Sequence, residues 1–135
     1  MKTLLFICSG NTCRSPMAMA VARTYPKIYA FSRGMNALDG TSIADNSKKA
    51  LELAQVPVPP HKARKLRPED VKRADMIFVM TKIQLTDMKL IYPEAANKTF
   101  MLNPIADVED PFGDELEPYL KCLKLIQDLV YLWVK

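Results

Sequence analysis

Residues 2–16 read KTLLFICSGNTCRSP, an apolar run followed by a loop of small and polar residues and then a proline. The continuous apolar run over 2–7 predicts a strand that is buried on both faces, as in a parallel sheet. Proline suits the first turn of a helix, so Pro16 indicates a helix over 15–24. The stretch is therefore typical of the first strand, loop and helix of an α/β domain.

The same alternation of strands and helices continues along the chain. Further strands are predicted at 27–31, 75–80 and 99–102, and further helices within 39–54 and at 67–74, 81–91 and 114–134. This order predicts a single doubly wound, three-layer α/β domain over residues 1–135, with a mainly parallel four-stranded sheet and helices on both faces. Ligands of such flavodoxin-like sheets bind beyond the carboxyl ends of the strands, where the loop after residue 7 lies.

The bulk composition is that of an ordinary globular protein. The chain has 135 residues, of which 49% are hydrophobic and 25% charged, enough for one domain and too few for two. The net charge of +4 is spread along the sequence, so no nucleic-acid partner is expected. A solvated basic surface is favoured over a preference for anionic substrates, which stays open. The apolar runs are too short for a signal peptide or a membrane span.

The cysteines and the histidine indicate neither a disulfide framework nor a metal site. Cys8, Cys13 and Cys122 are an odd number without framework spacing, which favours a reducing cytoplasm. No His, Cys and carboxylate cluster has ligand spacing, so we expect no metal and no other cofactor. Cys122 lies on the apolar face of the last helix and is assigned to the core. His61 follows a proline-rich loop and is interpreted as structural. A monomer is expected.

The loop from Cys8 to Arg14 has the composition of an oxyanion cradle. Backbone N–H groups that precede a helix can form an anion-binding nest, and Gly10 and Asn11 tolerate the left-handed angles that this requires. Arg14 can close the ring with a bidentate contact to phosphate. The same positive field favours the thiolate form of Cys8, to which the Ser15 hydroxyl can donate. Such a thiolate is a nucleophile directed at phosphorus.

The pattern C-x5-R-S after the first strand resembles the signature of the low-molecular-weight protein tyrosine phosphatase family. The DP pair at 110–111 and the segment HKARKL at 61–66 agree with other family motifs, and SRG at 32–34 stands where the family usually has Ser-Ala-Gly. The resemblance covers essentially the whole chain. Two departures do not touch the catalytic residues. The segment RTYPKIYAF is shorter than usual, and MAMA stands where a Glu usually follows Met-Ala.

The resemblance implies hydrolysis of phosphorylated proteins through a phosphocysteine. Cys8 would be the nucleophile, Arg14 would bind the phosphate, and Asp110 would act as general acid and then as general base. Asp107 and Asp114 are interpreted as loop and helix-start residues. A silent phosphopeptide binder is disfavoured because all three reactive groups are present. The residues expected to bind phosphate or support the loop are Ser9, Gly10, Asn11, Thr12, Cys13 and Ser15.

Thr12 and Phe112 bear on the choice of substrate. Tyrosine-specific relatives usually have a branched apolar residue at the position of Thr12, and Tyr or Trp after Asp-Pro. The combination GNTCRSP with DPFG resembles the bacterial protein-arginine phosphatases. A hydroxyl at the rim of the cradle suits a guanidinium phosphate, whereas an apolar group suits a phenyl ring. Phosphoarginine is therefore favoured slightly over phosphotyrosine, and Phe112 is interpreted as a wall of the substrate pocket.

Other interpretations stay open beside this one. Cys13 is either core filler at the helix start or, as in family members with this second cysteine, a redox partner of Cys8. A flavodoxin-like FMN-binding module also has a phosphate-binding first loop, but it needs neither Cys8 nor Asp110. An arsenate reductase of similar fold needs further cysteines in mid-chain, and none lies between Cys13 and Cys122.

Overall fold

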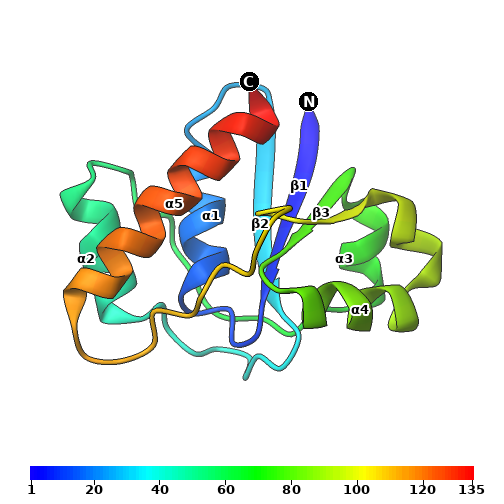
Figure 1. Cartoon of the computed structure of the whole chain (residues 1–135), viewed down its shortest axis with the longest axis horizontal. Helices are drawn as coiled ribbons and strands as arrows, with labels where there is room; N and C mark the ends of the chain where they lie inside the picture. Colours follow the sequence, from blue (N-terminus) through cyan, green and yellow to red (C-terminus); the bar gives the residue numbers. More distant parts are fainter.

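A computed structural model describes residues 1–135, and its four strands form one parallel sheet (Figure 1). The strands are β1 (Lys2–Cys8), β2 (Ile28–Gly34), β3 (Met76–Val79) and β4 (Thr99–Met101), in the order β2-β1-β3-β4. The chain moves from β1 to β2 on one side and then crosses to β3 on the other, so the strand order reverses beside β1. Open α/β sheets bind ligands at such a reversal, at the carboxyl ends of the strands.

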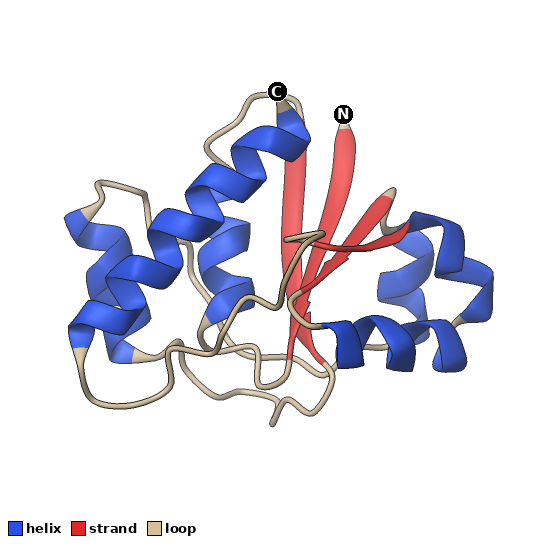
Figure 2. Ribbon diagram, in the orientation of Figure 1, coloured by secondary structure: helices blue, strands red, loops and turns tan.

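Helices cover both faces of the sheet, which confirms the predicted doubly wound, three-layer fold (Figure 2). Helices α1 (Arg14–Ala22), α2 (Asp45–Leu53) and α5 (Leu116–Val134) lie on one side, and α3 (Pro68–Arg73) and α4 (Lys82–Ile91) on the other. The chain also has a 3₁₀ helix, η1 (Pro93–Lys98), before β4. No helix has the length and apolar character that crossing a membrane requires.

Strand β1 is the centre of the core because both of its faces are covered. Successive side chains of a strand point to opposite faces. Leu4 and Phe6 accordingly pack with the α1, α2 and α5 side chains, and Leu5 and Ile7 with those of α3 and α4. Full burial of such a side chain stabilises the fold by about 1.5–3 kcal/mol. The loop after Cys8 therefore starts from the most firmly held strand of the sheet.

The structure corrects several predicted boundaries. Strand β2 runs to Gly34 rather than residue 31, because its polar end pairs with β1 up to Cys8. Helix α1 spans 14–22 rather than 15–24, and α5 begins at 116 rather than 114. The η1 helix, which follows α4 at Pro93, is not among the predicted elements.

Candidate active site

Cys8 is the last residue of β1 and forms the floor of the loop that leads into α1. Its Sγ is buried and lies 2.9 Å from Ser15 Oγ. Ser15 Oγ also accepts a hydrogen bond from Asn11 Nδ2, at 2.8 Å. A hydroxyl has one proton to donate, and this second contact leaves the proton of Ser15 free for the sulfur. Ser15 Oγ is therefore placed to donate its proton to Cys8 Sγ.

Asn11 fastens the loop to three other segments. It is completely buried and has a φ of 57°, in the left-handed region. Its Nδ2 donates to Ser32 Oγ (2.9 Å) as well as to Ser15, and its Oδ1 accepts from the Arg64 N–H (2.9 Å). Its carbonyl oxygen lies 2.7 Å from His61 Nε2. Protein groups alone thus hold the curl of the loop.

Two sequence interpretations bear on this curl. The left-handed conformation predicted for Gly10 and Asn11 occurs at Asn11 only, so Gly10 does not need the freedom of glycine there. His61 contacts the back of the loop, and since a carbonyl can only accept, its Nε2 carries the proton. Burial lowers the pKa of His61, with help from the charges of Arg33 and Arg23. The lowered pKa favours the neutral ring, and the contact with the carbonyl selects its tautomer with the proton on Nε2.

Arg14 connects the loop to the segment that carries Asp110. Its guanidinium is buried, with Nη1 donating to the Val108 carbonyl at 2.8 Å and Nη2 lying 3.9 Å from Asp110 Oδ2. Its Nε is also buried and has no hydrogen-bond partner. Buried N–H groups nearly always have an acceptor, so an unpartnered donor at this loop suits an oxyanion ligand.

The three acids near the site have different surroundings. The Asp110 side chain is 46% exposed and lies beside Arg14. Asp107 Oδ1 instead accepts from the Lys82 N–H at the start of α4, at 2.8 Å. The Asp114 carboxylate makes no hydrogen bond. Of the three carboxyl groups, that of Asp110 therefore lies beside the Arg14 guanidinium and is open to solvent.

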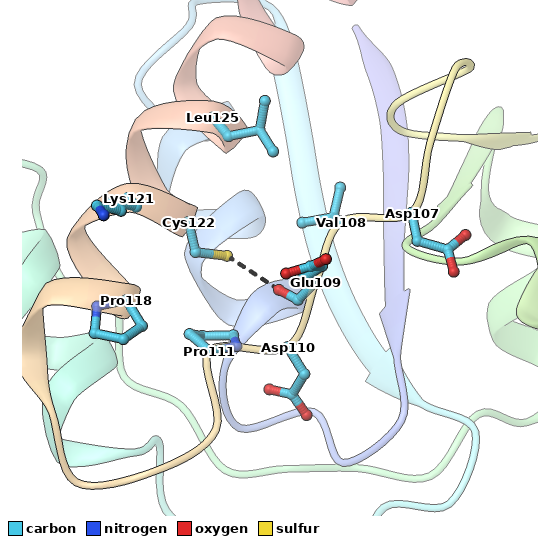
Figure 3. Close-up of a pocket in the computed structure, with 9 residues that line it drawn as sticks. All are labelled: Asp107, Val108, Glu109, Asp110, Pro111, Pro118, Lys121, Cys122 and Leu125. Carbon is cyan, nitrogen blue, oxygen red and sulfur yellow. Dashed lines mark hydrogen bonds between the residues drawn. The ribbon is translucent and has the colours of Figure 1, made fainter.

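A cavity of about 370 Å³ separates the Asp110 segment from α5 (Figure 3). The Asp110 carboxylate points away from Cys122, whose thiol donates to the Glu109 carbonyl at 3.9 Å. Burial raises the pKa of Cys122 to about 12, so its thiol stays protonated. Cys122 belongs to the hydrophobic core, as predicted. No group of three or more His, Cys, Asp or Glu side chains is arranged to hold a metal ion.

The sequence model described as low molecular weight phosphotyrosine protein phosphatase matches residues 3–135. The chain belongs to this family. It is 32% identical to the probable low molecular weight protein-tyrosine-phosphatase EpsP of Ralstonia nicotianae, over 98% of this chain and 94% of that one. It is 31% identical to the protein-arginine-phosphatase of Geobacillus stearothermophilus, over 94% of this chain and 90% of that one.

Solved structures of this phosphatase family have the same fold. The low molecular weight protein tyrosine phosphatase from T. tengcongensis matches with a TM-score of 0.94 and 32% identity, over 99% of this chain and 98% of that one. The YwlE arginine phosphatase from G. stearothermophilus matches with a TM-score of 0.91 and 30% identity, over 97% of this chain and 89% of that one. The relatives are named as phosphatases of proteins, which makes them hydrolases. This phosphatase is a hydrolase too.

Thr12 and Phe112 of the phosphatase stand apart from the contacts that hold the loop. The Thr12 side chain is half-buried, and its Oγ1 contacts only Cys13 Sγ, at 3.8 Å. Phe112 is 85% exposed, and its N–H donates to Asp110 Oδ1 at 3.2 Å. Both side chains are free to contact a substrate.

Gln84 is a supporting residue that the sequence analysis missed. Its Oε1 accepts from the N–H groups of Met80 and Thr81, at 2.9 and 3.1 Å. Its Nε2 donates to Ser9 Oγ at 3.2 Å, which joins the loop to the start of α4. The sequence TKIQ at 81–84 has the spacing of a capping box and was the available signal.

We expect Gly34→Ala to damage the site, because Gly34 packs directly beneath the loop. An added Cβ would lie 2.7 Å from the Ser9 carbonyl oxygen and 3.0 Å from Asn11 Cβ. The overpacking should lower the free energy of unfolding by about 1–3 kcal/mol. Displacement of the loop should lower kcat/KM by about 10²-fold. Urea unfolding and steady-state kinetics measure the two effects.

Gly10→Ala is the matched stability control for this change. Its Cβ would meet only Thr12 Oγ1, at 3.7 Å, which is ordinary contact. Its free energy of unfolding should stay within about 0.5 kcal/mol of wild type. Equal destabilisation by both substitutions would contradict the packing argument at Gly34.

Proposed function

We propose that this phosphatase works in two steps through a phosphocysteine at Cys8. In the first, the Cys8 thiolate attacks phosphorus in line with the leaving group, which takes a proton from Asp110 as its bond to phosphorus breaks. In the second, Asp110 removes a proton from water, the water oxygen attacks phosphorus, and the sulfur–phosphorus bond breaks. The loop N–H groups and Arg14 hold the equatorial oxygens in both steps.

The unpartnered, buried Nε of Arg14 is the observation that carries this proposal. It leaves a charged donor for a phosphate oxygen next to the carboxylate of Asp110. Cys8 Sγ lies at the floor of the same loop, where the Ser15 hydroxyl supports a thiolate as attacking group and as leaving group. A flavodoxin-like module has no use for this combination. An arsenate reductase of similar fold shares the cysteine loop, but it needs further cysteines in mid-chain, and the chain has none between Cys13 and Cys122.

We infer that phosphoarginine is favoured slightly over phosphotyrosine as the substrate. The hydroxyl of Thr12 suits a polar guanidinium phosphate. The exposed segment that Arg14 joins to the loop is rich in carboxylates, which pair well with a guanidinium group: Asp107, Glu109, Asp110, Asp114 and Glu115. The relatives include proteins named for each substrate, so phosphotyrosine is the second candidate.

The test compares kcat/KM on phosphoarginine and phosphotyrosine peptides with the same flanking residues. Thr12→Val removes the hydroxyl at nearly constant shape. It should lower the ratio of kcat/KM on phosphoarginine to kcat/KM on phosphotyrosine by about tenfold, the effect of one lost hydrogen bond. Thr12→Ser keeps the hydroxyl and should retain most of the wild-type ratio. A wild-type ratio well below one, unchanged in Thr12→Val, would overturn the preference for phosphoarginine.

We expect mild peroxide to inactivate the enzyme reversibly through a Cys8–Cys13 disulfide. All three cysteines are free thiols, and burial raises the pKa of Cys13, so its reactive thiolate is more abundant at alkaline pH. The yield of disulfide should therefore rise between about pH 7 and pH 9, as followed by mass spectrometry. In Cys13→Ala, peroxide should carry Cys8 on to irreversible sulfinic acid. The same irreversible product in wild type would leave Cys13 as core filler.

A further inference from the structure

A second basic site lies at the β2 edge of the sheet. A cavity of about 470 Å³ is lined there by side chains from α1, β2, the 60–64 segment and α3. None of its lining residues belongs to the catalytic loop or to the Asp110 segment. We call it the basic pocket and define it by its cationic side chains and one histidine: Arg23, Arg33, His61, Lys62, Arg64 and Arg73.

The positive charge of the basic pocket is largely unneutralised. Only Arg33 pairs with a carboxylate, that of Asp70, at 3.0 Å. The other four cations make no ion pair, so five cationic groups and one carboxylate give a formal net charge of +4. This equals the net charge of the whole chain. Like charges that converge in a concave site raise the local concentration of anions.

Two aromatic rings fix the positions of three guanidinium groups. The rings of Tyr29 and Phe31 are stacked, with centroids 6.1 Å apart. Arg73 and Arg33 lie 4.0 and 5.0 Å from the Phe31 centroid, and Arg23 lies 5.7 Å from that of Tyr29. Cation–π contacts of this kind hold guanidinium groups in place. Less side-chain freedom is then lost when a ligand binds.

The basic pocket also touches the support of the catalytic loop. His61 and the backbone of Arg64 hold Asn11, while Lys62 and Arg64 are among the residues that line the pocket. Lys62 Nζ donates to Ser42 Oγ at 3.0 Å. The charges of Arg33 and Arg23 act on His61, whose lowered pKa is caused first by burial and then by them. A ligand that neutralised these charges would change the surroundings of Asn11 through this one segment.

We propose that the basic pocket binds a small anion with a chain of phosphate groups. A single phosphate can reach only some of the cations, which come from four segments around a cavity larger than one phosphate group. A chain of two or three phosphates spans them, and the arginine forks match its oxygens. The proposal concerns a site separate from the catalytic one and does not depend on the phosphatase chemistry.

Amide NMR of the whole chain tests the proposal, because it observes the two sites separately. Tripolyphosphate is titrated at constant ionic strength and should shift the Lys62, Arg64 and Arg73 amides along one saturable curve. Its Kd at these amides should be about tenfold or more below that of orthophosphate, since additional charge-assisted hydrogen bonds are made. ATP is a parallel arm. A lower Kd for ATP identifies a nucleotide as the better source of the phosphate chain, and an equal or higher Kd identifies the inorganic chain.

The matched variants remove the same charge from two different surfaces. Lys62→Gln/Arg64→Gln changes exposed side chains and should weaken tripolyphosphate binding by about tenfold or more. The control Lys89→Gln/Lys135→Gln changes exposed lysines elsewhere and should bind as wild type does. Unchanged Tm values verify that both variants fold. Shifts confined to the amides of residues 9–14, or equal weakening in both variants, would overturn the proposal.

Discussion

Cys8→Ser should abolish turnover while phosphate and vanadate still bind. A serine hydroxyl at neutral pH is a far poorer nucleophile than a thiolate, and losses on the order of 10⁴-fold or more follow removal of a catalytic nucleophile. Binding should persist, because the N–H groups of the loop and the guanidinium of Arg14 do not depend on the sulfur. Steady-state kinetics and calorimetric titration with phosphate measure the two properties.

Cys122→Ala is the control for this substitution. Cys122 is a core thiol whose pKa of about 12 keeps it protonated, and it faces the cavity beside α5 rather than the floor of the loop. Its loss should change kcat by less than about tenfold, even though it costs some stability. Activity of Cys8→Ser within tenfold of wild type would exclude the covalent mechanism.

Asp110→Asn should lower kcat/KM by an amount that depends on the leaving group. Phenolate from phosphotyrosine has a pKa near 10 and needs a proton in the transition state, which is typically worth about 10²–10⁴ in rate. The phenolate of an activated aryl phosphate leaves more readily, so kcat/KM on that substrate should fall much less. On phosphoarginine the loss should be at least as large as on phosphotyrosine, because the leaving nitrogen is far too basic to depart as an anion.

The pattern across the three substrates separates the possible roles of Asp110. The Asp110 carboxylate lies 3.9 Å from Arg14, and its Oδ1 also accepts the Phe112 N–H, so its removal can disturb the segment as well as the chemistry. A uniform loss on all substrates would point to such a disturbance. No loss on any of them would reduce Asp110 to a turn residue and make Asp107 or Asp114 the next candidate.

The first strand, its loop and the first helix could be predicted because their signals are local. The apolar run before Cys8 and the position of Pro16 lie within a few residues of the features they predict. The end of β2 could not, since Ser32 and Arg33 are polar and owe their places to partners such as Asn11 and Asp70. Burial of polar groups depends on hydrogen bonds from elsewhere in the chain, which periodicity does not reveal.

The proposed catalytic residues could be found from the sequence, whereas the residues that support the loop could not. The spacing of Cys8 and Arg14 is visible in the sequence, and the family resemblance added Asp110. Apart from the nearby Ser15, the partners that hold Asn11 are 21, 50 and 53 positions away from it, at Ser32, His61 and Arg64. Only the folded chain brings these segments together, so the reason for an asparagine in the loop emerged from the structure.

The isolation of Thr12 and Phe112 has a consequence for how such enzymes can diverge. Neither side chain takes part in the network around Asn11, and neither fills the core. Exchanges at these two positions should therefore cost little folding free energy, typically within about 0.5 kcal/mol for surface sites. Because selection removes variants mainly when they fall below a stability threshold, exchanges here escape that filter. On the proposed role of these two positions, single exchanges here would shift the preference between arginine and tyrosine substrates without compensating changes elsewhere.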